Sequence, residues 1–322
     1  MKNKNFYWVY LLLIFSCQPN NMVSFDLKDN PKELTLFAED LISTPLYERD
    51  FAVSPDGNEV LFTRGTYTQK IRALVSISSE GATWGEAQIL PFSGKYQDIE
   101  PFYAPDGSKL YFASNRPIYN DTTRSDYNIW AVERKENGWG VPFHLDSIIN
   151  TKNDEFYPAV SSNGNLYFTA TRTDGIGRED IFLSEYASGQ YQTPTPLDST
   201  VNSTLYEFNA YVNPDESFII FSSFGREDGY GGGDLYFSEK SAHGSWTPAQ
   251  NMGPELNSEF LDFCPFVDQK HGNLYFSSDR TDQIPVSVES AQDILNEANK
   301  TLNGMGNIYR INLSNTPLKS LQ

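Results

Sequence analysis

Histidine and cysteine are scarce in this sequence, and their scarcity argues against several kinds of chemistry. The 322 residues include 3 histidines and 2 cysteines. His144 and His243 lie in or beside predicted outer strands and His271 lies in a turn, so we expect neither a histidine-dependent triad nor a multi-histidine metal centre. Two cysteines cannot form a disulfide framework. The motifs HExxH, GxSxG, GxxxxGK(S/T) and CxxC are also missing. We therefore expect no metal centre and no cofactor.

Positive charge is the second scarce feature. Lys and Arg number 24 against 42 Asp and Glu, which gives a net charge of −18. A protein that binds phosphate backbones needs a basic face, so nucleic acid is not expected as a partner. The acidic surface favours solubility and a monomer. Cationic or uncharged partners remain open.

Long hydrophobic runs are also lacking, and the longest, residues 6–15, lies at the start of the chain. It is too short to span a bilayer and it follows Lys2 and Lys4, so it predicts a signal peptide over residues 1–16. The segment Ile14-Phe15-Ser16-Cys17 resembles the lipobox of bacterial lipoproteins, although Phe15 stands where a small residue is usual. The resemblance implies acyl chains on Cys17. A plain secretory signal with an incidental cysteine is the alternative.

Lipidation of Cys17 would decide where the protein works. It predicts a lipoprotein of the bacterial cell envelope, anchored in the outer membrane, with residues 17–32 as a polar tether. Cys264 is then the remaining cysteine, and its neighbours Phe263 and Phe266 predict a buried and unreactive thiol.

What the sequence does contain is a repeat. Five times an acidic residue precedes the middle of a tight-turn signal by eight positions, with a period of about 53 residues, long enough for four short strands. The acids are Glu48, Asp98, Glu155, Glu207 and Asp262. The turns are 55–57, 105–107, 162–164, 214–216 and the degenerate 269–271.

Each of the first four repeats contains the same four predicted strands, and the fifth contains the first three. The first strand follows the acid and ends at the turn, where Pro presets φ and Gly permits positive φ. The second is aromatic and β-branched, as in a strand covered on both faces; its copies are 60–62, 110–112, 166–168, 219–221 and 274–276. A third and a fourth strand follow, and the fourth opens with pairs such as Trp84-Gly85. Four strands per unit, repeated radially, predict a β-propeller.

The repeats resemble a known family. The runs Ala104-Pro105-Asp106-Gly107 and Leu110 to Arg116, and the run Leu274 to Arg280, are similar to the WD40-like PD40 repeats of TolB-type propellers. The resemblance covers residues 34 to 311 and departs from the pattern at Glu216 and at the fifth turn. It implies a propeller fold, and functions from periplasmic scaffolds to attachment modules beside peptidoglycan-binding domains.

We therefore predict an all-β protein with one five-bladed propeller over residues 33–313 and a tail over 314–322. TolB-type propellers have six blades, which is the alternative, but five units fit here. The fifth unit stops after its third strand, and the segment 34–41 resembles an outer strand. We expect this segment to complete the fifth blade and close the ring.

The acids and the ends of the second strands should meet on one face. An arginine follows each second strand: Arg64, Arg116, Arg172, Arg226 and Arg280. Arginine opposite a carboxylate forms a partly buried pair, which favours a structural role. The five acids would surround the channel mouth, either as latches between blades, as a site for a cation or basic ligand, or as catalytic carboxylates.

Two segments break the symmetry. In the insertion 283–304, apolar residues recur three and four positions apart and Gly304 is placed to end a helix, either over the acidic face as a lid or docking element, or packed on the rim. The glycine-rich segment 228–234 predicts a flexible hairpin that could hold Ca²⁺ weakly, although its spacing is not that of an EF-hand.

Two functions remain open. The first is a lipid-anchored, non-enzymatic propeller that binds an envelope protein or glycan on the acid-lined face. The second is a carbohydrate-active hydrolase or lyase, with Glu48, Asp98 and Glu155 as the candidate catalytic residues.

Overall fold

The computed structural model describes residues 24–81, 83–119, 121–136, 138–281 and 287–318. The predicted signal peptide and Cys17 lie outside the described residues. No described helix is long and apolar enough to cross a membrane.

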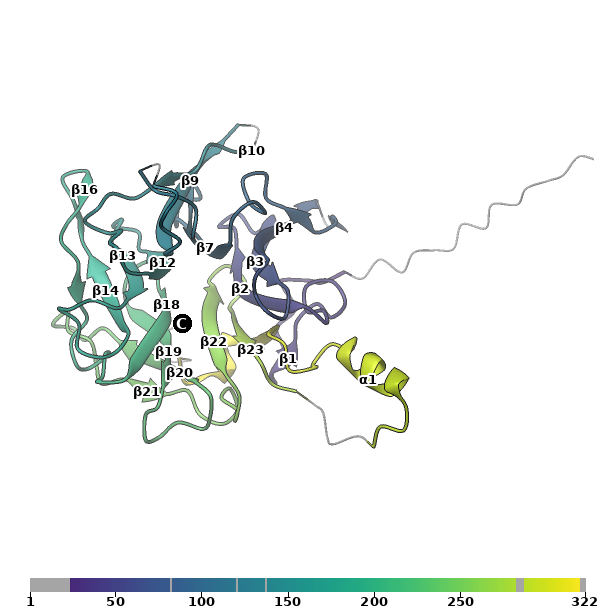
Figure 1. The fold of residues 1–322 in the computed structure, drawn as a ribbon. Coiled ribbons are helices and arrows are strands. Elements are labelled where there is room, and N and C mark those ends of the chain that lie inside the picture. Colours follow the sequence, from purple (N-terminus) through teal and green to yellow (C-terminus); the bar gives the residue numbers. More distant parts are fainter. Residues whose placement is uncertain (1–23, 82, 120, 137, 282–286, 319–322) are drawn as a thin grey trace, which may run out of the picture.

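The chain folds as a five-bladed β-propeller, so the predicted fold is confirmed and the six-bladed alternative is wrong (Figure 1). Each blade is an antiparallel sheet, and in blades 1 to 4 the strands run outward from the axis in chain order. Blade 1 contains β2 (Tyr47–Val53), β3 (Glu59–Gly65), β4 (Arg72–Glu80) and β6 (Gln88–Ile89). Blade 2 contains β7 (Asp98–Tyr103), β8 (Lys109–Ser114), β9 (Asn128–Lys135) and β11 (Phe143–His144). Blade 3 contains β12 (Glu155–Val160), β13 (Leu166–Ala170), β14 (Asp180–Ser184) and β17 (Thr195–Pro196). Blade 4 contains β18 (Tyr206–Val212), β19 (Phe218–Phe224), β20 (Asp234–Glu239) and β21 (Gln250–Asn251).

Short strands extend three of these blades beyond their outer edge. β5 (Thr83–Trp84) pairs with β4, and β10 (Gly138–Trp139) pairs with β9. β15 (Tyr186–Ala187) and β16 (Gln190–Tyr191) form a separate hairpin on blade 3.

Blade 5 joins the two ends of the chain. It contains β22 (Asp262–Asp268), β23 (Asn273–Ser278), β24 (Asn307–Asn312) and, from the start of the chain, β1 (Thr35–Leu36). Thr35 pairs with Arg310 and Leu36 with Tyr309, which confirms the predicted closure. The strand is shorter than the predicted segment 34–41, because Ala38 (φ 49°) turns the chain away from the sheet. Because closure pairs the outer edge of β24, the ring has no open seam.

The second strands form the middle of the protein. Their central aromatic residues are fully buried between neighbouring blades: Phe62, Phe112, Phe168, Phe221 and Phe276. The turns before them need positive φ, which Gly57 (72°) and Gly107 (70°) supply. Glu216 adopts the same conformation (60°), and its carboxylate accepts hydrogen bonds from Lys240 Nζ and Asn165 Nδ2, both at 2.7 Å.

The predicted helix is present, but it covers neither the acidic face nor the rim of the ring. α1 (Ala291–Ala298) begins at Ser290, whose side chain forms a capping box with Asp293, and none of its residues is buried. It projects from the side of the ring in Figure 1, so both the lid and the rim-packed helix are wrong. Gly304 does not end it, because the helix stops at the cap residue Asn299.

Candidate functional site

The five repeated carboxylates lie at the inner ends of the blades and are completely buried. Each is within ion-pair distance of the arginine that follows the second strand of its own blade. The nitrogen–oxygen distances are 2.8 Å for Arg64–Glu48, 2.6 Å for Arg116–Asp98, 3.8 Å for Arg172–Glu155, 2.9 Å for Arg226–Glu207 and 2.6 Å for Arg280–Asp262.

Nearby hydroxyl and backbone N–H groups donate further hydrogen bonds to the oxygens of each carboxylate. In four blades the acid accepts hydrogen bonds from the backbone N–H and the hydroxyl of a Ser or Thr four residues earlier; in blade 1, Thr44 donates from N at 3.0 Å and from Oγ1 at 2.7 Å to Glu48. In blade 2, Ser93 and Ser114 donate to Asp98 at 2.8 and 2.6 Å instead. A buried carboxylate needs this compensation for its lost hydration.

The same unit connects neighbouring parts of the ring. Each arginine also donates to a backbone carbonyl in the loop that enters its blade, as Arg116 Nη2 does to Phe92 O at 3.2 Å. For Glu48, Glu155, Glu207 and Asp262, the backbone N–H of the acid also donates to a carbonyl of the preceding blade, for example Glu207 N to Glu179 O at 2.9 Å. We call this unit of acid, arginine and hydroxyl the blade latch.

The latch at Glu155 differs from the others. Its arginine is the most distant, at 3.8 Å, and Arg172 Nε has no hydrogen-bond partner among the described residues. Burial raises the pKa of Glu155 to about 7, against the lowering effect of Thr151 and Arg172. This carboxyl therefore exchanges a proton close to neutral pH.

Sequence reasoning missed a second ring, two residues after each acid. There the first strand bulges, and the residue adopts a positive φ between 46° and 62°. These residues are Asp50, Glu100, Tyr157, Asn209 and Cys264, all buried. Tyr157 Oη in blade 3 donates to Pro265 O in blade 5 at 3.0 Å, a contact between non-adjacent blades that only residues at the axis can make. Polar residues inside otherwise apolar strands were the available signal.

The bulges interlock the blades through their N–H groups. Asp50 N donates to Ser277 Oγ of the preceding blade at 3.2 Å, and Glu100 N donates to Thr63 Oγ1 at 3.2 Å. Blade 2 has Ala113 at the hydroxyl position, and there Glu100 Oε2 accepts the N–H of Tyr157 at 2.7 Å. Glu100 thus replaces the hydroxyl that Ala113 lacks.

Arg49 supplies the positive charge beside this second ring, which we call the axial ring. It donates to Asp50 Oδ1 and Glu100 Oε1, both at 2.8 Å, and its guanidinium lies 5.0 Å from the centre of the Phe263 ring. Burial raises the pKa of Glu100 to about 7, while Arg49 acts in the opposite direction. Cys264 is completely buried beside Arg49, at 3.4 Å, and burial raises its pKa.

A cavity of about 300 Å³ lies above this ring, which we call the axial cavity. All five residues that directly follow the latch acids line it: Arg49, Ile99, Phe156, Phe208 and Phe263. Tyr47, Arg72, Tyr127 and Glu179 are also in its wall. Burial, with Asp154 and Asp180 nearby, raises the pKa of Glu179 to about 7. The latch acids themselves line none of the cavities described here.

Two larger recesses adjoin the axial cavity. One of about 670 Å³ shares Tyr127, Phe156 and Glu179 with it. Another of about 430 Å³ shares Arg72. The face of the propeller on which the chain enters the first strand of each blade, which we call the entry face, therefore carries one extended depression over blades 1 to 3.

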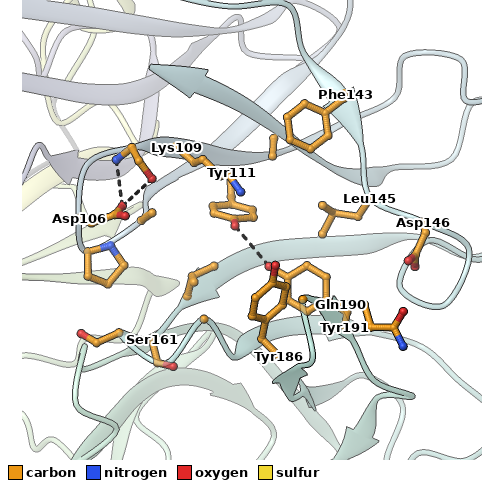
Figure 2. A pocket seen from close by; sticks show the side chains of 18 of the residues that line it. Asp106, Lys109, Tyr111, Phe143, Leu145, Asp146, Ser161, Tyr186, Gln190 and Tyr191 are labelled. Atoms are coloured by element: carbon orange, nitrogen blue, oxygen red, sulfur yellow. Dashed lines mark hydrogen bonds between the residues drawn. The ribbon is translucent and has the colours of Figure 1, made fainter. Parts of the chain in front are cut away.

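A separate cleft of about 680 Å³ lies between blades 2 and 3 on the side of the Pro-Asp-Gly turns (Figure 2). Tyr111 and Tyr191 meet at its base with their hydroxyls 3.3 Å apart. Tyr186 is 43% exposed and Phe143 is 41% exposed on its walls.

The described residues offer no metal centre. No group of three or more His, Cys, Asp or Glu side chains is arranged to hold an ion there. In the glycine-rich segment 228–234, Asp234 Oδ2 accepts from Tyr230 N at 2.7 Å, and a Cβ on Gly231 would meet the Glu259 backbone at 2.2 Å. These glycines permit close packing on the next blade.

No protein-family model and no curated protein sequence matches the chain. Among solved structures, the catalytic domain of a GH62 α-L-arabinofuranosidase from Coprinopsis cinerea matches with a TM-score of 0.50 and 13% identity, covering 89% of this chain and 99% of that one. TolB from Acinetobacter baumannii matches with a TM-score of 0.46 and 12% identity, covering 71% and 48%. A protein of unknown function from Dyadobacter fermentans matches with a TM-score of 0.44 and 14% identity, covering 76% and 78%.

These likenesses concern the fold. The chain spans about half the length of the TolB chain that it matches. The prediction of a β-propeller is confirmed at the level of the fold.

Proposed function

We propose that this protein is a binding propeller of the cell envelope that takes a saccharide in the axial cavity and its adjoining recesses. The observation that carries this proposal is the composition of the cavity wall, where Phe156, Phe208 and Phe263 stand beside Arg49 and Glu100. Aromatic faces pack against the apolar faces of sugar rings, and planar charged groups bond sugar hydroxyls. A concave, mixed wall of this kind is typical of a small-ligand site.

The envelope location rests on the sequence. The lipobox-like segment that ends at Cys17 supports a lipid anchor, and residues 17–32 would then connect the anchor to the ring. The resemblance of the repeats to TolB-type propellers supports a periplasmic or surface-exposed envelope protein. The domain limits 33–313 for the ring and 314–322 for the tail are part of this proposal.

A carbohydrate-active hydrolase or lyase is the second candidate, for one specific reason. Glu179 lines the axial cavity, and burial raises its pKa to about 7, which suits a general acid or base. Glu48, Asp98 and Glu155 support this reading less well, because latch partners surround them and no described cavity reaches them.

Binding and turnover can be measured on the same samples. Soluble oligosaccharides are titrated calorimetrically into the full chain, the F156A/F208A double variant and F224A, whose 46% exposed ring lies outside the cavity. Loss of affinity in the double variant alone supports the proposal. Equal affinity in all three proteins contradicts it. Release of reducing sugar that E179Q abolishes would select the enzyme.

A further inference from the structure

One recess on the entry face has a charge opposite to that of the whole protein. The 430 Å³ recess beside the axial cavity is lined by Lys70, Arg72, Lys95 and Arg124, and its wall contains no Asp or Glu. The axial cavity, the 670 Å³ recess and the cleft between blades 2 and 3 each have at least one carboxylate in their walls. The contrast stands out in a chain with 42 acidic and 24 basic residues.

Three of these cations have no carboxylate partner within ion-pair distance among the described residues. Lys70 and Lys95 are exposed. Arg72 bonds neutral groups: Gln97 Oε1 at 2.7 Å, Gln69 Oε1 at 3.3 Å and the Tyr127 hydroxyl. Arg124 differs, because it bonds Asp126 and the Thr151 carbonyl. Like charges gathered in one recess repel one another, and the fold alone offers little compensation for that cost.

The positive charge continues from this recess to the axis. Arg72 lines both the recess and the axial cavity, and Arg49 lies at the floor of the axial cavity. Glu100 partly neutralises Arg49, whereas Arg72 faces amide and phenol oxygens. An extended ligand would therefore meet aromatic rings near the axis and cations toward the rim.

We propose that the saccharide of this site is anionic, and that its carboxylate or phosphate groups occupy the recess of Lys70, Arg72 and Lys95. Guanidinium and ammonium groups bond such anions with charge-assisted hydrogen bonds. A local cationic recess gains specificity here because the negative field of the rest of the protein repels anions elsewhere. This inference rests on the saccharide-binding function proposed above.

The test compares ligands that differ only in charge. The full chain is titrated with oligogalacturonate, with the same oligomer as its uncharged methyl ester, with a phosphate-bearing mannan oligomer, and with inorganic phosphate. We expect oligogalacturonate or the phosphate-bearing oligomer to bind at least about ten-fold more tightly than the ester, since several charge contacts add to the sugar contacts. The two charged oligomers distinguish carboxylate from phosphate, and inorganic phosphate shows whether the anion alone suffices.

Charge variants localise the effect. K70Q/K95Q should weaken binding of the charged oligomer about three- to ten-fold and reduce its dependence on salt, since exposed charge contacts are screened. The control K28Q/K32Q removes the same charge from two exposed lysines outside the recess and should leave binding unchanged. An ester that binds as tightly as the charged oligomer, or equal losses in both double variants, overturns the anionic inference while the saccharide proposal stands. If no saccharide binds, charged or uncharged, the proposed function itself fails.

Discussion

Replacing Arg116 by methionine should destabilise the protein strongly, because the substitution leaves a buried charge without its counter-charge. Asp98 is completely buried, and Arg116 Nη2 contacts its Oδ1 at 2.6 Å. Ser114 and Ser93 would still donate to the carboxylate, but hydroxyl groups do not neutralise it. Breaking a buried pair by removing one partner costs about 3–5 kcal/mol. Methionine keeps part of the packing against Phe112, so most of this cost is electrostatic.

The five latches provide an internal comparison. Arg172 lies 3.8 Å from Glu155, and this carboxyl has a pKa of about 7, so it can take up a proton when the arginine is removed. R172M should therefore cost about 1–2 kcal/mol, close to the loss of one charge-assisted hydrogen bond. Both variants are measured by equilibrium urea unfolding near pH 7.5, with fluorescence and circular dichroism as independent probes.

Two results would refute this reasoning. If the unfolding free energy of R116M lies within about 0.5 kcal/mol of that of the unmodified chain, compensation of a buried charge is not the role of Arg116 in the latch. If D98N loses ligand binding or turnover while its unfolding is unchanged, Asp98 is a functional group and not a latch. The double variant D98N/R116M should be more stable than the sum of the single losses predicts, because it removes both charges together.

Four further outcomes are expected. F37A removes a ring that is 1% exposed in the closing segment, packed 5.0 Å from Tyr275, and should lower the unfolding free energy by about 3–5 kcal/mol in urea titrations. The raised pKa of Glu155 gives stability that is complete below about pH 4.5 and is lost as the pH rises through about 7, so E155Q should flatten the fall in unfolding free energy measured across that window. Cys264, at 0% exposure, should react with a thiol reagent only when urea unfolds the ring. Replacing α1 by a glycine–serine linker should change the unfolding free energy by less than about 0.5 kcal/mol, because the helix buries no residue.

The repeat made the architecture predictable because the same turn and strand signals occur in it five times. The Pro-Asp-Gly turns and the aromatic second strands recur at fixed spacing, and a strand missing at one end of the chain matched a spare strand at the other. Closure of the ring could therefore be predicted by counting the strands at the two ends of the chain. The helix was predictable as an amphipathic segment, but its docking was not, since periodicity shows which face is apolar and not whether a surface exists to cover it.

The axial ring could not be placed in the same way. Strict alternation along the first strands would put residues 48 and 50 on one face, but the bulge inserts an extra residue and redirects the second of them to the axis. Glu100 shows the difficulty best, since its role depends on Ala113, a residue on another strand that lacks a hydroxyl. A propensity pattern does not contain such a compensation between strands.

The bulge also separates stability from recognition within three consecutive residues. The latch acid holds the blade, the next residue faces the axial cavity, and the bulged residue holds the axis. Only at the middle position does the side chain make no structural bond that recurs in every blade, and the residue there varies accordingly among Arg49, Ile99 and three phenylalanines. Substitutions of Phe156 and Phe208 at this position should therefore change the ligand while the ring stays closed. The acids that appear most prominent in the sequence are, on this argument, the residues least available to a ligand.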